Sequence, residues 1–182
     1  RDTDGDGKGD TWVPEWGDFM SLDPDGDPNT PLTISYSLII TDSVFSDSYT
    51  TTNSVHEDIV NGSDAWEAMV VQAFAYWSEV SGINFVKIEE TVNKVGDIRI
   101  GMSSGDFGTA GGWCYVWGST SKISDIWIRD NYDPVTGSNY GPAILIHEIG
   151  HALGLSHTFS NAFSSSLQTN TNLYSVMAYT GH

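Results

Sequence analysis

The chain becomes regularly patterned at Leu32, where apolar and polar side chains begin to alternate through residues 32–38. Such alternation is typical of a strand with one buried face. Four later segments are rich in β-branched or aromatic residues and are bounded by Gly, Ser or Asn, which also indicates strands. They are residues 84–87, 97–102, 112–117 and 124–129. We therefore expect a mixed, twisted sheet of about five strands.

Residues 64–81 carry apolar side chains at helical spacing, which predicts a helix that backs the sheet. We expect Asp64 to cap its start, with Glu67 three residues later, and Gly82 to end it. The apolar stripe is interpreted as core and not as a ligand platform. It consists of Trp66, Met69, Val70, Ala73, Phe74, Trp77 and Val80.

A second helix is predicted to open at Gly141-Pro142 and to run from Ala143 to about Leu153. Proline is tolerated in the first turn, because its missing N–H has no helical partner there. The strands and the two helices together indicate the α+β fold class.

The first 31 residues differ from the rest, because they are rich in Asp, Gly and Pro and lack apolar periodicity. We interpret residues 1–31 as an acidic N-terminal segment and residues 32–182 as one globular domain, a size that can bury a good core. The chain opens on Arg1-Asp2-Thr3-Asp4 and not on a signal sequence, so any leader or propeptide is expected to lie outside these residues.

The formal net charge is −17, from 7 basic and 24 acidic residues. Such a charge repels phosphate backbones and anionic lipid, which argues against nucleic acid as a partner and favours calcium as a counter-ion. No apolar run reaches the roughly 18 residues of a membrane span, so we expect no membrane partner.

The single cysteine, Cys114, cannot form an intramolecular disulfide. We interpret it as a small buried hydrophobic residue. A thiol nucleophile is set aside, because the spacing of the histidines assigns them to another site.

That site is formed by His147, His151 and His157. His147 and His151 are four residues apart, so on a helix they lie about 40° around and about 6 Å along the same face. If the helix continued, His157 would lie about 240° further round than His151 and face away. The helix must therefore end between these two histidines, and Gly154 lies where a turn of positive φ is needed.

Three neutral imidazoles leave one position of a tetrahedral zinc ion open for water, as in catalytic zinc sites. Zinc lowers the pKa of such a water and polarises a scissile carbonyl. Glu148, next to the first histidine, is positioned to take the proton from the water and pass it to the leaving amine. We therefore predict Glu148 as the general acid and base.

The run from His147 to His157, HEIGHALGLSH, resembles the consensus of the metzincin zinc peptidases, and its Leu155-Ser156 pair resembles the serralysin branch. Residues 175–179, SVMAY, are similar to the serralysin Met-turn. Residues 72–79 together with 83–85, and then residues 96–100, resemble the helix and strand shared by serralysins and matrixins. The likeness covers about 150 of the 182 residues, loosely outside the motifs.

The resemblance implies the fold of a metzincin catalytic domain, with an active-site helix, and the activity of a secreted zinc endopeptidase. Met177 would underlie the zinc site, and Tyr179 would ligate zinc or stabilise the tetrahedral intermediate. The strand around Gly112, Trp113, Cys114 and Tyr115 would be the edge on which an extended substrate lies antiparallel. An internal strand with ordinary aromatic packing is the alternative for that segment.

Two departures from the serralysin pattern concern the branch. Thr158 stands where serralysins usually have proline and matrixins more often have Ser or Thr, whereas Tyr179 favours a serralysin or an astacin. The chain ends at His182, before the family's following helix, so we expect the peptidase domain to be truncated at its C-terminal end.

The acidic segment contains Asp2, Asp4, Asp6 and Asp10 at positions 1, 3, 5 and 9 of an EF-hand-type loop, with Gly7 at position 6. The twelfth position is Val13 and not the bidentate glutamate. We predict calcium binding here, with a solvated acidic linker as the alternative.

The sequence thus predicts a secreted, monomeric zinc endopeptidase that acts on proteins or peptides, with calcium as a second ion. The alternatives are a matrixin-like or astacin-like peptidase and, from another class, a calcium-dependent adhesion or surface-layer module with a vestigial zinc site.

Overall fold

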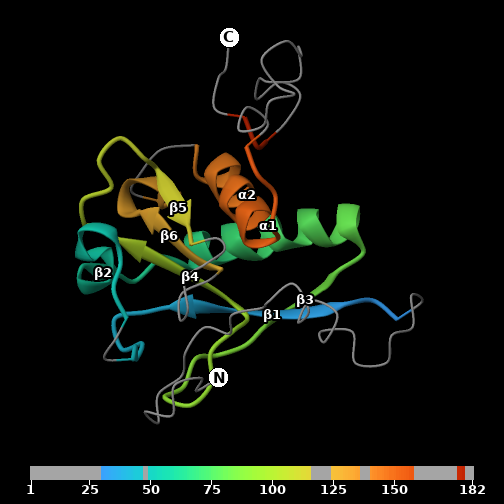
Figure 1. Ribbon diagram of the computed structural model, residues 1–182, viewed down its shortest axis with the longest axis horizontal. Helices are drawn as coiled ribbons and strands as arrows, with labels where there is room; N and C mark the ends of the chain where they lie inside the picture. Colours follow the sequence, from blue (N-terminus) through green and yellow to red (C-terminus); the bar gives the residue numbers. More distant parts are fainter. Residues whose placement is uncertain (1–29, 47–48, 116–123, 136–139, 158–175, 179–182) are drawn as a thin grey trace.

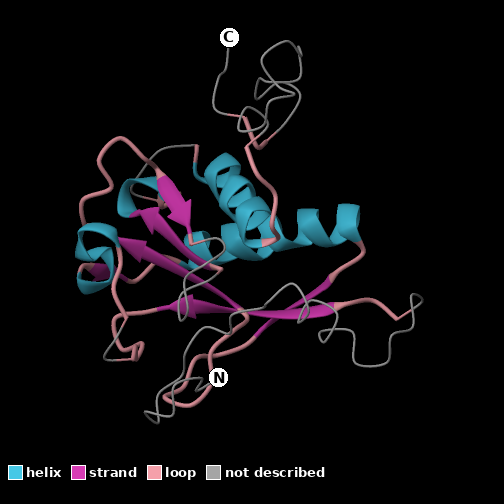
Figure 2. Ribbon diagram, in the orientation of Figure 1, coloured by secondary structure: helices cyan, strands magenta, loops and turns pink. Residues whose placement is uncertain are grey.

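Two helices cover one face of a mixed sheet in the computed structural model (Figures 1 and 2). The structure describes residues 30–46, 49–115, 124–135, 140–157 and 176–178. The predicted calcium ligands Asp2, Asp4, Asp6 and Asp10 and the predicted site residue Tyr179 lie outside these ranges, as does Thr158.

The sheet has six strands, one more than expected, in the order β3-β1-β4-β6-β5, with β2 paired to β4 off this path. β1 pairs in parallel with β3 and β4, and β4 pairs in parallel with β6. The two antiparallel pairs are β5 with β6 and β2 with β4. The additional strand, β2, has two residues, too few to show a periodic pattern. The bounds are β1 Thr33–Ile39, β2 Ile59–Val60, β3 Asn84–Lys87, β4 Ile98–Ser103, β5 Gly112–Cys114 and β6 Asp125–Arg129.

Helix α1 spans Asp64–Ser81 and ends at Gly82, whose φ of 74° is left-handed, as the sequence predicts. The predicted cap at Asp64 is wrong by one residue. Ser63 is the N-cap, because its backbone is extended and its Oγ accepts the Trp66 N–H at 3.1 Å. Glu67 then falls one position too late for a capping box, and its carboxylate pairs with Lys87 Nζ at 2.7 Å.

The main core lies between the sheet and the two helices. Alternate residues of β1, β4 and β6 face the helices, because successive side chains of a strand point to opposite faces. The predicted stripe of α1 packs here except for Val80, which is 76% exposed in the last turn of the helix. The buried members from the sheet are Ile34, Tyr36, Ile98, Ile100, Met102, Ile126 and Ile128, and those from the helices are Trp66, Val70, Ala73, Phe74, Leu145, Ile149 and Ala152.

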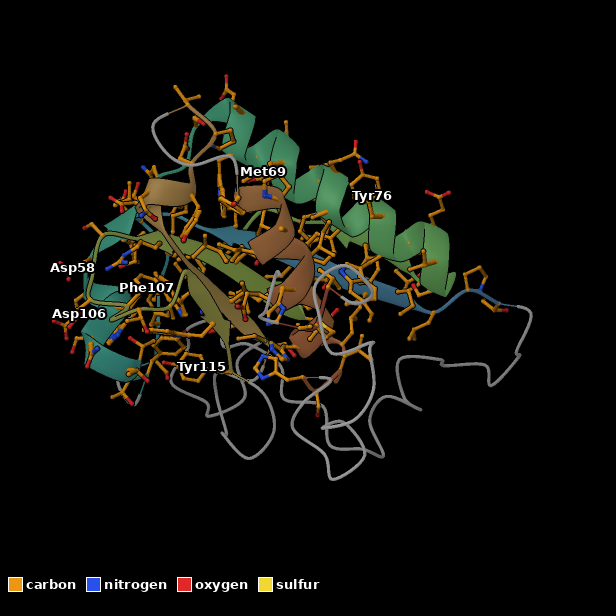
Figure 3. All side chains as sticks on the ribbon, turned by 90° about the horizontal axis from the view of Figure 1, so that it is seen from above. Asp58, Met69, Tyr76, Asp106, Phe107 and Tyr115 are labelled. Atoms are coloured by element: carbon orange, nitrogen blue, oxygen red, sulfur yellow. The ribbon has the colours of Figure 1, made fainter. Side chains whose placement is uncertain are left out.

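A second cluster covers the opposite face of the sheet. Trp127 of β6 lies over Gly101 of β4 and contacts the loop residues on that side. Its buried members are Ile39, Tyr49, Val55, Phe107 and Trp127. Figure 3 labels Phe107 of this cluster and Tyr115, which packs against it, and also Met69 and Tyr76, which lie on α1.

Cys114 is partly buried and packs against the main core, and burial raises the pKa of its thiol well above the usual value. The described helices include none that is both long and apolar enough to cross a lipid bilayer.

Candidate metal centre

The active-site helix predicted from the sequence is α2, which spans Gly141–Ala152. It is followed by a Schellman turn, in which the Leu155 N–H bonds to the Gly150 carbonyl and the Gly154 N–H to the His151 carbonyl, both at 2.9 Å. Gly154 has a φ of 90°, a conformation that glycine adopts without a Cβ clash. The turn reverses the chain and returns His157 to the face of the helix that carries His147 and His151.

The three histidines meet at their Nε2 atoms. The Nε2 atoms of His147 and His151 are 3.1 Å apart, those of His147 and His157 3.1 Å, and those of His151 and His157 2.9 Å. A tetrahedral zinc ion at about 2.0–2.1 Å from each imidazole nitrogen would set those nitrogens about 3.3 Å apart. The donor set and its spacing therefore fit zinc. That the three histidines bind zinc stays a prediction.

Two of the imidazoles have their tautomers set by backbone carbonyls. His147 Nδ1 lies 2.6 Å from the Val176 oxygen, and His151 Nδ1 lies 2.7 Å from the Leu155 oxygen. A carbonyl only accepts, so each Nδ1 carries the proton and the lone pair of the neutral ring is on Nε2. Carbonyl partners of this kind orient a histidine for metal binding.

The surroundings of His157 and His151 favour the neutral form of these two rings. Burial and the neighbouring rings of His151 and His147 lower the pKa of His157 to about 4. Burial also lowers the pKa of His151, against the opposing effect of its hydrogen bond to Leu155. Neutral imidazoles are the form that a metal ion requires.

Glu148 lies next to the first histidine and is only 6% exposed. Burial raises the pKa of its carboxyl to about 8, while a hydrogen bond from the Cys114 backbone acts in the opposite direction. A divalent cation at the Nε2 atoms would lower this pKa, because a nearby positive charge favours the carboxylate. The position suits a group that exchanges protons near neutral pH.

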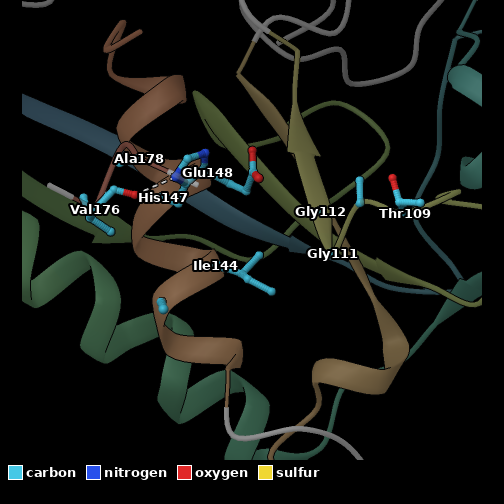
Figure 4. Close-up of a pocket in the computed structure, with 10 residues that line it drawn as sticks. Thr109, Gly111, Gly112, Ile144, His147, Glu148, Val176 and Ala178 are labelled. Atoms are coloured by element: carbon cyan, nitrogen blue, oxygen red, sulfur yellow. Dashed lines mark hydrogen bonds between the residues drawn. The ribbon is translucent and has the colours of Figure 1, made fainter. Parts of the chain in front are cut away.

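A cavity of about 640 Å³ opens beside His147 and Glu148 (Figure 4). Its walls are residues 109–112 on one side and Ala143 and Ile144 of α2 on the other, and Val176 and Ala178 complete it. The cavity is mostly apolar, and Glu148 lies in its wall. This arrangement can hold a side chain next to the reacting groups.

β5 is the end strand of the sheet order and pairs with β6 alone among the described strands. Gly111 O accepts the Arg129 N–H and Tyr115 N donates to Asp125 O, both at 3.0 Å. By the alternation of an antiparallel pair, the N–H and C=O groups of Gly112 and Cys114 then face away from β6. Of the four residues predicted for the substrate edge, Gly112 lines the cavity, and Trp113 and Tyr115 pack their side chains on the opposite face of the sheet.

Met177 is 4% exposed and lies against α2. A Cβ placed at Gly150 would come within 2.6 Å of the Met177 Sδ. The turn at 176–178 thus contacts α2 twice, through Met177 and through the Val176 carbonyl that orients His147.

Sequence reasoning did not find the carbonyls of Val176 and Leu155, nor Ala143 and Ile144 in the cavity wall. Backbone carbonyls carry no signal of residue type. The Leu155 carbonyl could have been suspected, because a Schellman turn after Gly154 returns that residue toward the helix end.

Two curated proteins are similar in sequence to this chain. Serralysin A of Dickeya chrysanthemi is 30% identical over 117 residues, which cover 59% of this chain and 25% of that protein. Metalloendoproteinase 5-MMP of Arabidopsis thaliana is 28% identical over 116 residues, which cover 54% of this chain and 32% of that protein. The chain therefore spans about a third or less of the length of these relatives.

No protein-family model matches the chain. Among solved structures, that of myroilysin aligns with a TM-score of 0.43 at 17% identity, over 81% of this chain and 68% of the other. The matches to a serralysin and to a plant metalloendoproteinase, one from each of the two groups that the motifs resemble, support a metzincin-type metalloprotease catalytic domain in this chain.

Proposed function

We propose that this chain is the catalytic domain of a secreted zinc endopeptidase that cleaves proteins or peptides. One observation carries the proposal: three Nε2 atoms converge within 3.1 Å of one another, beside a buried glutamate and a cavity. The names of the two relatives support a metallopeptidase. The resemblance to serralysins supports secretion.

His147, His151 and His157 would hold the zinc ion. When bound there, zinc supplies Lewis acidity toward a scissile carbonyl and toward water. Glu148 takes a proton from the attacking water and delivers it to the leaving amine. Its burial next to His147 supports this role, because a divalent cation held by the histidines would offset the effect of burial on its pKa and favour the carboxylate that accepts the proton.

The substrate would lie in extended form along β5. The outward-facing backbone groups of Gly112 and the carbonyl of Cys114, whose N–H donates to Glu148, would pair with the peptide backbone, and one substrate side chain would enter the cavity. Substrates N-methylated at single backbone amides test this. Methylation at amides that pair with β5 should lower kcat/KM at least tenfold, whereas methylation at the alternate amides should have little effect.

Two further residues take their parts from the resemblance. Met177 would support the zinc site from below. Tyr179 would ligate zinc or stabilise the tetrahedral intermediate, and its presence favours a serralysin-like enzyme over a matrixin-like one. Tyr179→Phe should lower kcat with little change in KM if the hydroxyl acts in the transition state.

Replacing Glu148 by Gln tests the central assignment, because the amide keeps the shape but cannot accept the proton. Glu148→Gln should abolish peptide hydrolysis while the protein still binds one zinc ion, measured by metal analysis. Glu79→Gln, on the far helix α1, is the matched control and should keep wild-type activity. Retained hydrolysis by Glu148→Gln would contradict the assignment.

The adhesion module is the alternative from another class, and neither curated relative is of that kind. Pure zinc-loaded protein that fails to cleave casein or a peptide library at any calcium concentration would favour it over the peptidase.

We also propose the division into an acidic segment, residues 1–31, and a peptidase domain, residues 32–182. Calcium would bind to Asp2, Asp4, Asp6 and Asp10, and the spacing of these carboxylates supports this. Titration calorimetry should show calcium binding that the double variant Asp4→Asn/Asp6→Asn removes. The control is Asp23→Asn/Asp25→Asn, which changes two carboxylates of the same segment outside the predicted loop and should leave calcium binding unchanged.

A further inference from the structure

Trp77 of α1 contacts one particular turn of α2. Its indole Nε1 donates to the Ile146 carbonyl at 3.0 Å. Cζ2, two bonds from Nε1 on the same edge of the indole, lies 3.1 Å from the position that a Cβ of Gly150 would occupy. In an α-helix the Ile146 carbonyl also accepts the N–H of Gly150. One edge of the indole therefore lies against the helix turn that the hydrogen bond between Ile146 and Gly150 closes.

This turn carries the chemistry of the candidate site. His147 and Glu148 lie within it, and His151 is the residue after Gly150. The same glycine meets Met177, whose Sδ lies 2.6 Å from the Cβ position. The turn 146–150 is thus held by Trp77 from the backing helix and by Met177 from the segment whose Val176 carbonyl orients His147.

The Trp77 contact is one of at least two separate contacts between the helices. Met69, two turns earlier in α1, lies against Gly141 at the start of α2. Both helices therefore advance in the same direction, and Trp77 meets α2 where the ligands lie. Residues that only fill the core between the helices, such as Val70 and Leu145, are fully buried and carry no such hydrogen bond.

We propose that Trp77 is a positioning residue for the zinc site: its indole N–H and ring edge fix the turn 146–150, and with it the Nε2 atoms of His147 and His151 and the carboxylate of Glu148. The inference rests on the zinc site proposed above. Partners outside the ligand shell commonly change metal affinity or activity by about 10–100-fold when they are removed. Because Trp77 acts through the backbone, we expect an effect near tenfold.

The test compares two tryptophans of the same helix. Trp77→Phe removes the N–H and keeps an aromatic ring, and Trp66→Phe is the matched control at a more deeply buried site in the first turn of α1. Three quantities are measured on the whole chain: the zinc Kd by chelator competition, the visible spectrum of the cobalt-substituted protein, and kcat and KM separately.

For Trp77→Phe we expect the zinc Kd to rise about tenfold, the cobalt spectrum to shift, and kcat to fall about tenfold while KM stays within twofold. Trp66→Phe should lower the melting temperature and leave zinc Kd, cobalt spectrum and kcat within twofold of wild type. A Trp77→Phe protein that matches wild type or Trp66→Phe in zinc Kd and cobalt spectrum would overturn the proposal.

A second variant isolates the hydrogen bond. Site-specific replacement of Trp77 by β-(3-benzothienyl)alanine keeps the two-ring shape with sulfur in place of the N–H, so it serves even where Trp77→Phe does not fold. The same rise in zinc Kd is expected, and an unchanged value would contradict the part given to the N–H. If wild-type protein binds zinc but cleaves no peptide, the proposed function is wrong, and zinc Kd and cobalt spectrum still decide this inference.

Discussion

His151 donates its Nδ1 proton to the carbonyl of Leu155, 2.7 Å away, in the turn that Gly154 makes possible. The turn therefore has two effects on the candidate site. It returns His157 to the other two histidines, and it supplies the acceptor that fixes the tautomer of His151. A change in this turn should disturb metal binding more than it disturbs the fold.

Gly154→Ala tests this relationship. Alanine at positive φ costs about 1–2 kcal/mol, and the displaced turn should raise the zinc Kd by at least tenfold. Gly82→Ala is the matched control, because Gly82 also follows a helix at positive φ and a Cβ there would meet no atom within 4 Å. Both variants should lose similar stability in urea, but only Gly154→Ala should bind zinc more weakly. Equal zinc affinity in the two variants would show that the turn does not set the site.

Removing zinc should destabilise the protein. An ion that binds only the folded state, at a thousand times its Kd, stabilises by about 4.1 kcal/mol. At about 2–4 °C per kcal/mol for a chain of this length, chelation should lower the melting temperature by roughly 10 °C. Zinc should restore it and magnesium should not, because magnesium prefers oxygen ligands.

Two histidine variants test the same change in melting temperature, measured by calorimetry with and without zinc. His151→Ala should remove the response to zinc, and His56→Ala, at a site remote from the triad, should keep it. A full response in His151→Ala would place the ion elsewhere.

Removing one partner of a buried ion pair should destabilise the protein far more than removing one partner of an exposed pair. Arg99 is fully buried and binds Glu90 through Nε and Nη2, both at 2.9 Å, with its guanidinium 4.4 Å from the ring centroid of Phe45. Arg99→Met leaves the buried carboxylate of Glu90 without its cationic partner and should cost about 3–5 kcal/mol. Among the described residues, only the hydroxyls of Ser37 and Ser43 then remain as donors to this carboxylate.

A double-mutant cycle with Glu90→Gln should give a coupling free energy above about 1 kcal/mol. The same cycle on Lys87 and Glu67, whose side chains are 26% and 48% exposed, should give less than about 1 kcal/mol. Similar values for both pairs, measured by urea unfolding, would show that burial does not strengthen this interaction.

Tyr49 should make the protein sensitive to alkali. Burial, and then the charge and hydrogen bond of Asp125, raise the pKa of its phenol well above the usual value. An unfolded tyrosine ionises near pH 10, so above that pH the unfolded state loses a proton that the folded state keeps. The free energy of unfolding should therefore fall as pH rises above about 10, by up to about 1.4 kcal/mol per pH unit.

Tyr49→Phe should be less stable than wild type at pH 7, because Asp125 loses a donor, and should lack this part of the alkaline slope. Tyr76→Phe replaces a half-exposed tyrosine and should keep the wild-type slope. A Tyr49→Phe protein with an unchanged slope would assign the alkaline sensitivity to other groups.

Local patterns were sufficient where the information is local. The spacing of His147 and His151 predicts that they share a helix face, and Gly154 predicts where that helix must end. The apolar stripe of α1 likewise predicts the buried face of the helix. Val80 is the exception, because it lies in the last turn and is exposed to solvent. The cap was misplaced by one residue, because Ser63 and Asp64 are both good caps and only the extended backbone at Ser63 decides between them.

The sequence by itself determined the helices, most of the strands and the set of groups that can meet at a metal ion, because these depend on spacing over a few residues. The tertiary structure alone decided the strand order, which makes β5 an edge, and the distant contacts of the site. The Val176 carbonyl lies 29 residues from His147, and the Trp77 indole lies 69 residues from the Ile146 carbonyl. Such contacts depend on how the layers pack, and a backbone carbonyl is the same in every residue type, so periodicity and motifs cannot reveal them.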